Sequence, residues 1–399
     1  MHSSPTASTR ILFPLTAMLA VLTTSSMAVT VIAVLAPEAA PRIGVDATRI
    51  GDYTAIVYLF ATLSGAVTGA MVDRFGAIRV CQITMLLATL AMLTFTRGTL
   101  TWVLISAVIL GCAYGPFNPA SAHVLWRLST PRWRPFVFSL KQTGVPLGGA
   151  LTGALIPVLV LWSDWQTAGL AVGAVALVMM ILLQPLRASI DEVHRRPLKL
   201  DMKSLLGPVQ LALGNPRLRG YTLTAFAYAG CQLSVMSFMV VFLTRAVNMS
   251  LVQAGSVFAF LQIGGFAGRL IWGGIASRLG SPRIVLVIIG AITATSLVVT
   301  PFMNATWPLL AVISLAIVLG ASSLGWNGVM LSEVATHAPE GRAVEATAGM
   351  QVVMFGGITV FPPIFGFLVM HTQSFTAAFV AVAVLAIGGA VLMASLPRA

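Results

Sequence analysis

Charge is what this sequence has least of. Charged residues make up 9% of its 399 residues, whereas hydrophobic residues make up 58%. A soluble domain carries roughly 25% charged residues, because most of its surface faces water. Water therefore cannot be the main solvent of this chain. This excludes a soluble globular protein and indicates a polytopic membrane protein.

Cysteine and the residue groupings of known catalytic sites are also scarce. The three cysteines, Cys81, Cys112 and Cys231, each fall inside a long apolar run, where a lone thiol acts as a small apolar filler. Their spacing fits neither a disulfide framework nor a metal site, and the chain shows no nucleophile motif or phosphate-binding loop. The sequence therefore predicts a protein that is not an enzyme and that has no cofactor.

Long apolar runs are what the chain has in abundance. A helix needs ~20 apolar residues to cross a hydrocarbon core of ~30 Å. We find twelve such runs, at about residues 11–36, 50–72, 80–97, 101–128, 136–161, 167–187, 219–244, 252–277, 284–302, 307–334, 345–370 and 375–396. The predicted fold class is therefore an all-α membrane protein with twelve transmembrane helices.

Basic residues are distributed unevenly between the two sides of the membrane. Most of those in the turns fall on the side of both termini, whereas the opposite side holds Arg42, Arg49, Arg97 and Arg245. Because cytoplasmic loops carry the excess of Lys and Arg, we expect both termini in the cytoplasm and a multi-pass protein of the cell inner membrane. This topology, with attraction to anionic lipid, accounts for the net charge of +12 without a nucleic-acid partner.

Two stretches of the chain repeat one another. The shared positions are Gly69 with Gly273, Arg74 with Arg278, Gly76 with Gly280, and Arg79 with Arg283. The repeat predicts two related halves, residues 1–187 and 219–399. Residues 188–218 are polar and basic, and we expect them to form a cytoplasmic linker that lies partly on the membrane surface.

The first copy of the repeat carries Asp73 where the second has Ser277, and Asp73 is expected to cap the next helix and to pair with a cytoplasmic arginine. The run from Gly69 to Arg79 resembles the loop signature between the second and third helices of the major facilitator superfamily. With the twelve spans and the basic middle loop, the resemblance extends over essentially the whole chain. It implies two pseudo-symmetric six-helix bundles that rock about a central site, with these repeat residues and Asp73 as gating positions.

Polar and aromatic side chains recur at matching depths in the two halves. Span four contains Tyr114 and Asn118 beside two prolines, which should break or kink the helix. Span ten has Trp326 and Asn327 at the equivalent depth. Each asparagine either lines a central cavity or bonds a neighbouring helix as a packing contact.

Further polar positions follow the same pattern. Gln142 in span five matches Gln351 in span eleven, and span seven offers Tyr228 and Gln232 one helical turn apart on one face. We include all four among the residues that could shape a substrate cavity. His123, near the cytoplasmic end of span four, is interpreted either as a packing residue or as a proton relay.

Two cations fall inside predicted spans. Arg269 lies in span eight, ~13 Å from its cytoplasmic end, where a charge costs ~2.5–3.5 kcal/mol. Lys141 in span five either takes part in substrate binding or gating, or extends its stem toward the cytoplasmic interface. Glu333 is the nearest carboxylate and could pair with one of them in one conformation. Otherwise an anionic substrate is expected to supply the missing counter-charge.

The spacing from Arg269 to Gly273 resembles the eighth helix of oxalate:formate exchangers and monocarboxylate transporters, where this arginine binds the substrate carboxylate. The basic residue that those relatives use in the first or eleventh helix has no counterpart here, so Lys141 would be a different solution. The run from Gly144 to Gly149 resembles, incompletely, the Gly-Pro-rich motif of drug:proton antiporters, because Val145 separates the glycine from the proline.

These features predict a secondary transporter of a small organic anion, with a carboxylate as the favoured substrate. Arg269 would be its anchor, because arginine captures carboxylates with two parallel hydrogen bonds. Proton symport and anion exchange both remain open, and the protein is expected to work as a monomer in lipid. The alternative is drug or metabolite efflux by proton antiport. A receptor or sensor would need a signalling domain, which the short tails do not offer.

Overall fold

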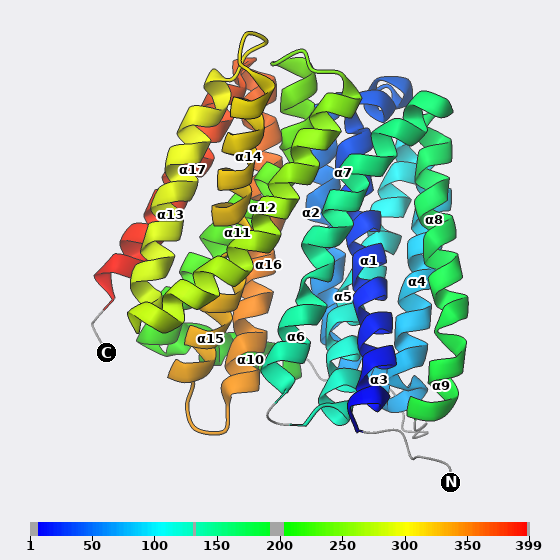
Figure 1. The fold of residues 1–399 in the computed structure, drawn as a ribbon, viewed down its shortest axis with the longest axis vertical. Coiled ribbons are helices and arrows are strands. Elements are labelled where there is room, and N and C mark those ends of the chain that lie inside the picture. Colours follow the sequence, from blue (N-terminus) through cyan, green and yellow to red (C-terminus); the bar gives the residue numbers. More distant parts are fainter. Residues whose placement is uncertain (1–6, 131–132, 192–202, 397–399) are drawn as a thin grey trace.

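The computed structural model describes residues 7–130, 133–191 and 203–396. Within these ranges the chain forms α-helices joined by short turns and contains no strand. Figure 1 shows the helices standing nearly side by side, with both ends of the chain on the same side. We call this the terminal side and the opposite one the far side.

The first half of the chain, here the N-terminal half, forms nine helices and one 3-10 turn. They are α1 (Ala7–Ile43), η1 (Ala47–Arg49), α2 (Ile50–Ala66), α3 (Thr68–Phe75), α4 (Ala77–Phe95), α5 (Leu100–Leu128), α6 (Arg134–Gln142), α7 (Gly144–Trp162), α8 (Trp165–Leu182) and α9 (Gln184–Ile190). The short helix α10 (Lys203–Gly214) follows and packs on the C-terminal half.

The rest of the chain, here the C-terminal half, also consists of α-helices and one 3-10 turn. Its elements are α11 (Pro216–Arg245), α12 (Leu251–Leu279), α13 (Pro282–Val299), η2 (Thr300–Phe302), α14 (Leu309–Ser323), α15 (Asn327–His337), α16 (Ala343–Thr372) and α17 (Phe375–Ser395). The boundaries of the linker at 188 and 218 stay a prediction, because residues 192–202 lie outside the described ranges.

The predicted all-α membrane fold is confirmed. Eleven helical stretches of the described chain are long and apolar enough to cross a membrane, and a bent pair supplies the twelfth. In that pair the helix ending at Ala66 turns by 55° into α3. The hydrophobic periodicity of a membrane span does not reveal such bends, because both arms of the bend are apolar.

Polar side chains cap helices where they emerge from the apolar layer. Asp164 accepts a hydrogen bond from the backbone of Thr167 at the start of α8, and Ser250 and Gln253 form a reciprocal capping box at the start of α12. Each cap satisfies N–H groups that have no partner within the helix. The caps therefore mark the helix ends that a polar environment can reach.

The prolines of span four are expected to break or kink its helix, and the structure shows no break. α5 runs without interruption through Pro116 and Pro119, whereas span ten is divided between α14 and α15. At Gly111 and Gly115 the backbone of α2 lies directly against α5, and an added Cβ would meet its carbonyl groups. We attribute the continuity of α5 to this support from the neighbouring helix.

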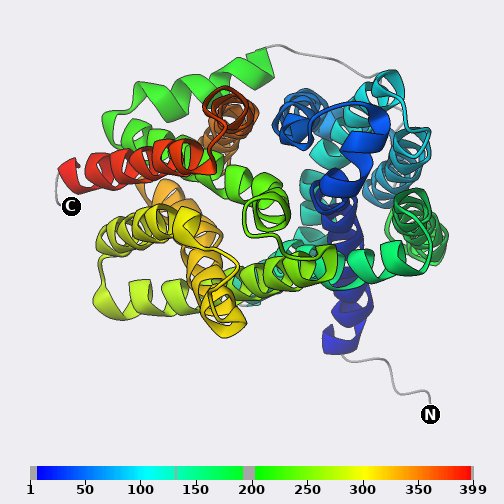
Figure 2. The same ribbon diagram turned by 90° about the horizontal axis from the view of Figure 1, so that it is seen from above.

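The two halves stand side by side (Figure 2) and meet along three helix pairs, α7 with α12, α2 with α16, and α1 with α11. We call this interface the seam. Gly153 on α7 and Gly255 on α12 lie so close that a Cβ on either would meet the backbone carbonyl of the other. Glycine therefore permits backbone-to-backbone packing of the two halves there.

Candidate functional site

Arg269 is the point at which the candidate site crosses the seam. Its Nε donates to the carbonyl of Leu324 at 3.3 Å, and its Nη1 donates to the carbonyl of Gln142 at 2.8 Å. Leu324 belongs to the same half as Arg269, whereas Gln142 ends α6 in the other half. The guanidinium therefore bridges the two halves through backbone oxygens.

The break in span ten supplies carbonyl groups to α12. α14 ends at Ser323 and α15 begins at Asn327, so carbonyls near the break lose their partners in a continuous helix. Trp272, less than one turn from Arg269, uses one of them by donating its indole N–H to Ala321 at 2.8 Å. The carbonyl groups at the break therefore hold the side chains of Arg269 and Trp272, which lie three residues apart on α12.

Lys141 lies in a pocket within the N-terminal half. Only 1% of the residue is exposed, and its ammonium donates to Asn118 Oδ1 at 2.7 Å, to Ser121 Oγ at 3.1 Å and to the carbonyl of Asn118 at 3.5 Å. The ammonium also lies 5.9 Å from the centre of the Phe138 ring. The lysine therefore does not extend to the interface, and its hydrogen-bond donors are in use inside its own half.

Gln142 and Asn118 connect the two cations. The side-chain amide of Gln142 donates to Asn118 Oδ1 at 3.5 Å, the same oxygen that accepts from Lys141. The backbone carbonyl of Gln142 accepts from Arg269. The four residues form one chain of contacts from the interior of the N-terminal half to the C-terminal half.

Aromatic rings lie beside this chain of contacts. Tyr114 is close enough to Arg269 to interact with it electrostatically. Its ring packs edge-on against that of Tyr58 of α2, with the ring centres 5.6 Å apart. Tyr58 in turn contacts Phe355 of α16 at 5.3 Å, across the seam. Sequence reasoning missed Tyr58 and Phe355, because single aromatic residues in apolar spans carry no motif.

The predicted residues of the C-terminal half are placed differently. Asn327 donates to Gln232 at 3.1 Å, so this pair joins α15 to α11. Tyr228 donates to the carbonyl of Leu286 at 2.8 Å and packs edge-on against the buried ring of Trp326 at 5.8 Å. These four residues therefore contact one another and α13 rather than Arg269.

Gln351 and Glu333 complete the residues predicted for the C-terminal half. Gln351 lies half-buried on α16. Glu333 accepts a hydrogen bond from the Tyr221 hydroxyl at 2.9 Å, and its Oε2 lies 3.9 Å from Nδ1 of His337. The suggested pairing of Glu333 with Arg269 or Lys141 does not occur in this conformation.

The predicted gating turn of the first half forms around Gly76. Its φ of 90° belongs to a region that L side chains rarely adopt. Asp191, beyond the end of α9, accepts hydrogen bonds from the backbone N–H groups of Ile78 and Arg79 at 2.8 and 2.9 Å. Asp191 therefore caps α4, and the expectation that Asp73 does so is wrong. Asp73 lies exposed on α3, and within the described part of the chain it has no hydrogen-bond or ion-pair partner.

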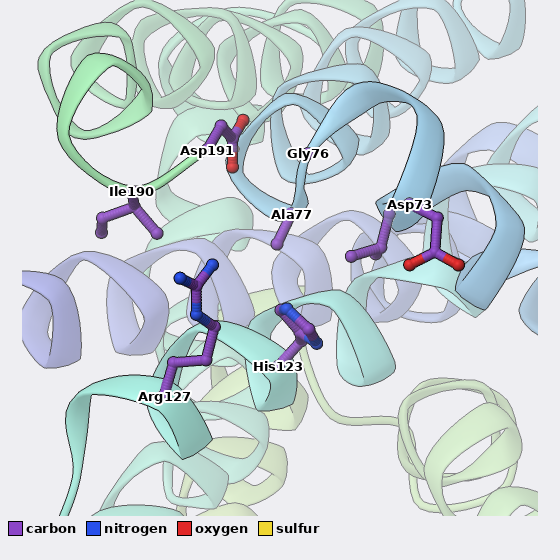
Figure 3. Close-up of a pocket in the computed structure, with 8 residues that line it drawn as sticks. Asp73, Gly76, Ala77, His123, Arg127, Ile190 and Asp191 are labelled. Atoms are coloured by element: carbon purple, nitrogen blue, oxygen red, sulfur yellow. The ribbon is translucent and has the colours of Figure 1, made fainter. Parts of the chain in front are cut away.

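Figure 3 shows the pocket beside this turn, of about 210 Å³, with Asp73 and Asp191 on one side and His123 and Arg127 projecting from α5. The other arginines of the repeat are held locally. Arg74 lies over the ring of Phe75, Arg79 donates to Gln82 at 3.3 Å, and Arg283 donates to carbonyl groups at the end of α17.

The glycines of the repeat differ in what they do. An added Cβ at Gly69 or Gly273 would meet no atom within 4 Å, so neither is required for close packing in this conformation. Gly280 has a φ of 59° and ends α12, and Arg278 is exposed two residues earlier. The positive φ of Gly76 and Gly280 is what the two copies share structurally.

Gln262 is an unpaired polar group in the seam. It is 0% exposed, and neither Nε2 nor Oε1 has a hydrogen-bond partner among the described residues. It lies two helical turns from Arg269 on α12 and packs against Gly149 of α7. Leaving a buried amide unpaired costs about 1–3 kcal/mol. Sequence reasoning missed Gln262, because its burial depends on the packing of the opposite half.

An ion pair closes the seam on the far side. Arg245, the last residue of α11, donates to both carboxylate oxygens of Asp46 at 3.0 and 2.9 Å. Asp46 also caps the 3-10 turn η1 by accepting from the backbone of Thr48 at 2.8 Å. Partial burial alone would raise the pKa of Asp46, but the hydrogen bonds from Thr48 and Arg245 outweigh it and lower this pKa.

Two sets of membrane helices with a polar site between them are the architecture of a membrane transporter. The sequence profile of the Major Facilitator Superfamily matches residues 18–355. The chain belongs to this superfamily, which consists of transporters and not of enzymes. It is 26% identical over 37% of its length to the probable sulfoacetate transporter SauU of Cupriavidus necator. It is 25% identical over 75% of its length to an uncharacterized MFS-type transporter of Mycobacterium tuberculosis.

A further relative is the probable galactarate/D-glucarate transporter GudP of Escherichia coli, 27% identical over 45% of this chain and 40% of the relative. The chain covers 34% of the length of the Cupriavidus protein and 66% of the mycobacterial one. Among solved structures, the nucleoside transporter NupG superposes with a TM-score of 0.77 at 15% identity, over 95% of this chain and 98% of NupG. A bacterial homolog of the human lysosomal transporter Spinster gives 0.75 at 15% identity, over 98% and 97% of the two chains. These superpositions support the fold alone.

Proposed function

We propose that this protein is a secondary transporter that moves a small organic anion, with a carboxylate as the favoured substrate, across the inner membrane by alternating access. Both termini would lie in the cytoplasm. The terminal side would then be the cytoplasmic side, and the seam and the Asp46–Arg245 pair would close the periplasmic side. The conformation described above would be the inward-facing one.

The observation that carries the proposal is the set of unused donors on Arg269. A guanidinium has five N–H groups. The contacts with Leu324 and Gln142 use the Nε proton and one Nη1 proton, and among the described residues no carboxylate pairs with the rest. A partly desolvated guanidinium with a free Nη edge suits bidentate capture of a carboxylate.

The names of the relatives agree with this chemistry. Sulfoacetate, galactarate and D-glucarate, the substrates named for the Cupriavidus and Escherichia proteins, all carry carboxylate groups. They support an organic acid as the substrate class of this chain. The local resemblance of the Arg269 segment to oxalate:formate and monocarboxylate carriers points to the same class.

The alternative, efflux of a drug or metabolite by proton antiport, has one observation in its favour. Glu333, Tyr221 and His337 form a partly buried cluster near the terminal side that could hold a proton. A proton site there would also serve symport of an anion. The cluster therefore does not favour efflux over uptake, and symport and exchange remain open.

The test uses purified protein in proteoliposomes with sulfoacetate, D-glucarate, acetate, an aromatic acid and a cationic drug as probes. Thermal shift should show stabilisation by at least one carboxylate, because a ligand that binds only the folded state stabilises it. Counterflow should show its transport. Arg269→Ala should insert and fold but lose both signals, whereas Arg97→Ala, which removes an exposed arginine outside the site, should keep them. Full transport by Arg269→Ala would contradict the proposal.

A further inference from the structure

The carbonyl of Gln142, which accepts from Arg269, is left free by a proline. In an α-helix the carbonyl of residue i accepts the N–H of residue i+4. For Gln142 that residue is Pro146, which has no N–H. The same span is divided at this point, because α6 ends at Gln142 and α7 begins at Gly144. The oxygen that a continuous helix would have occupied is therefore available to the other half.

Arg269 is held between two such oxygens. The carbonyl of Leu324 is free because α14 ends immediately before it, and the carbonyl of Gln142 is free because of Pro146. One oxygen belongs to each half. Nε and Nη1 donate to acceptors in opposite halves. These two hydrogen bonds together restrict rotation of the guanidinium about its side-chain stem, which a single hydrogen bond would not do.

We propose that Pro146 is a positioning residue for Arg269. By withholding an N–H from the Gln142 carbonyl, it orients the guanidinium so that the Nη2 edge remains free for the anion. Pro146 is buried in the span and does not itself contact substrate. The inference rests on the proposed function, and it adds that the N-terminal half orients the substrate anchor carried by the C-terminal half.

The matched experiment changes one N–H group. Pro146→Ala introduces the missing N–H, which can return the Gln142 carbonyl to its helix. Nonsense suppression with lactic acid at the same position gives the same methyl side chain with an ester oxygen in place of the N–H. The two variants differ in this N–H group and in the Val145 carbonyl, which becomes an ester and a weaker acceptor for the Ser26 hydroxyl. Ser26→Ala in the wild-type background controls for the second difference.

The first readout does not need a substrate. Labelling of Arg269 by phenylglyoxal, quantified by mass spectrometry, reports how firmly the guanidinium is held. We expect labelling several-fold faster in Pro146→Ala than in the wild type, and unchanged labelling with lactic acid. Equal labelling in Pro146→Ala and the wild type would overturn the inference. An equal increase in both variants would also overturn it, because the ring and not the missing N–H would then matter.

The second readout is uptake of the carboxylate probes, sulfoacetate, D-glucarate and acetate, in proteoliposomes. Pro146→Ala should raise KM by about tenfold, the effect of losing one hydrogen bond to a charged group, with a smaller change in the maximal rate. An unchanged KM would overturn the role in substrate binding. Pro146→Ala should also raise KM less in an Arg269→Lys background, because coupled residues are not additive.

The two proposals fail differently. If the wild type transports none of the carboxylate probes, the proposed substrate class is wrong, while the labelling comparison still tests the contact between the halves. If the wild type transports a carboxylate and loses it in Arg269→Ala, but Pro146→Ala behaves as the wild type, only the inference about Pro146 is wrong.

Discussion

Lys141 and Arg269 are both cations inside membrane-spanning helices, yet their surroundings differ in kind. Lys141 directs its ammonium to three oxygens, all within its own half. Arg269 uses two of its donors and directs them to different halves, and no described residue accepts from the others. Burial of a charge alone therefore does not identify a binding site. We propose that the number of donors that the protein leaves unused separates a structural cation from one that binds substrate.

Lys141 and Arg269 also differ in how much of the free-energy cost of burying their charge the protein compensates. A lysine with three acceptors is largely compensated by the protein, so its removal should affect folding. An arginine with free donors keeps part of its desolvation cost until a ligand arrives. We therefore expect substitution of Arg269 to change transport and substitution of Lys141 to change stability.

Replacing the arginine at the seam by a lysine tests this difference most directly. Arg269→Lys keeps the charge but loses the planar fork, so it cannot hold both carbonyl groups and an anion together. We expect a 10- to 100-fold fall in kcat/KM for the transported carboxylate, about 1.4 to 2.7 kcal/mol, with normal insertion. Initial rates of proteoliposome uptake measure it. Wild-type kinetics would show that charge alone is sufficient.

Removing the other cation should affect stability instead. Lys141→Ala leaves a cavity and takes the charged donor from Asn118 and Ser121, which should cost about 2–4 kcal/mol of folding free energy. The KM of the protein that still folds should stay within about threefold of the wild type. Thermal unfolding in detergent and uptake kinetics check the two parts. Lys141→Met fills the cavity and serves as the control for volume. A large rise in KM with normal stability would place Lys141 in the binding site.

Gln262 extends the comparison to a neutral group. Its amide has no partner among the described residues. Gln262→Met should therefore stabilise this conformation by about 1–2 kcal/mol, because it replaces an unpaired polar group by an apolar one of similar size. We expect a higher melting temperature and slower turnover, because opening the seam becomes less favourable. A lower melting temperature would indicate that Gln262 is hydrogen-bonded through water. Gln210→Met, at an exposed position of α10 outside the seam, gives the baseline.

The smallest effect is expected for the ion pair at the far side. Its side chains are 37% and 46% exposed, so Asp46→Asn should change stability by less than about 1 kcal/mol. Because the folded pKa of Asp46 is lowered, its contribution is fully present above the ordinary value of about 3.9 and is lost as the pH falls through the lower folded value.

Melting temperatures at pH 7 and pH 3, each with and without 0.5 M salt, test this prediction. Salt should reduce the difference between Asp46→Asn and the wild type, because both charges are partly solvated. Asp52→Asn is the matched control, since Asp52 pairs with Arg49 inside one half. Equal changes in melting temperature for Asp46→Asn and Asp52→Asn would show that Asp46 does not stabilise the seam.

Much of the candidate site could be predicted and part of it could not. Arg269 stands out in the sequence, because a charge in an apolar run needs an explanation. Asn118 and Gln142 are predicted from the sequence as positions that could line a cavity, and the structure shows contacts that the sequence does not predict, from Lys141 and Gln142 to Asn118. Tyr228 and Trp326 were grouped with them by depth along their helices. Depth does not determine which way a side chain faces, and both pack within the C-terminal half.

The turn at Gly76 teaches a similar lesson about distance along the chain. The glycines of the repeat indicate a tight turn, and the structure shows the positive φ of Gly76. The cap of α4 was assigned to the nearest carboxylate, Asp73, because capping residues usually precede a helix directly. The structure uses Asp191 instead, more than a hundred residues later. A helix end in a bundle can be capped by any carboxylate that the fold brings close.

Composition and apolar run length by themselves determined that this chain is an all-α membrane protein with twelve spans, because hydrocarbon admits only helices of that length with satisfied backbones. They also determined that Arg269 requires a partner. Only the tertiary structure decided that its present partners are the carbonyl groups of Gln142 and Leu324. Backbone oxygens have no signature in the sequence, and whether one is free depends on a proline or a helix end elsewhere and on which helices the fold packs together.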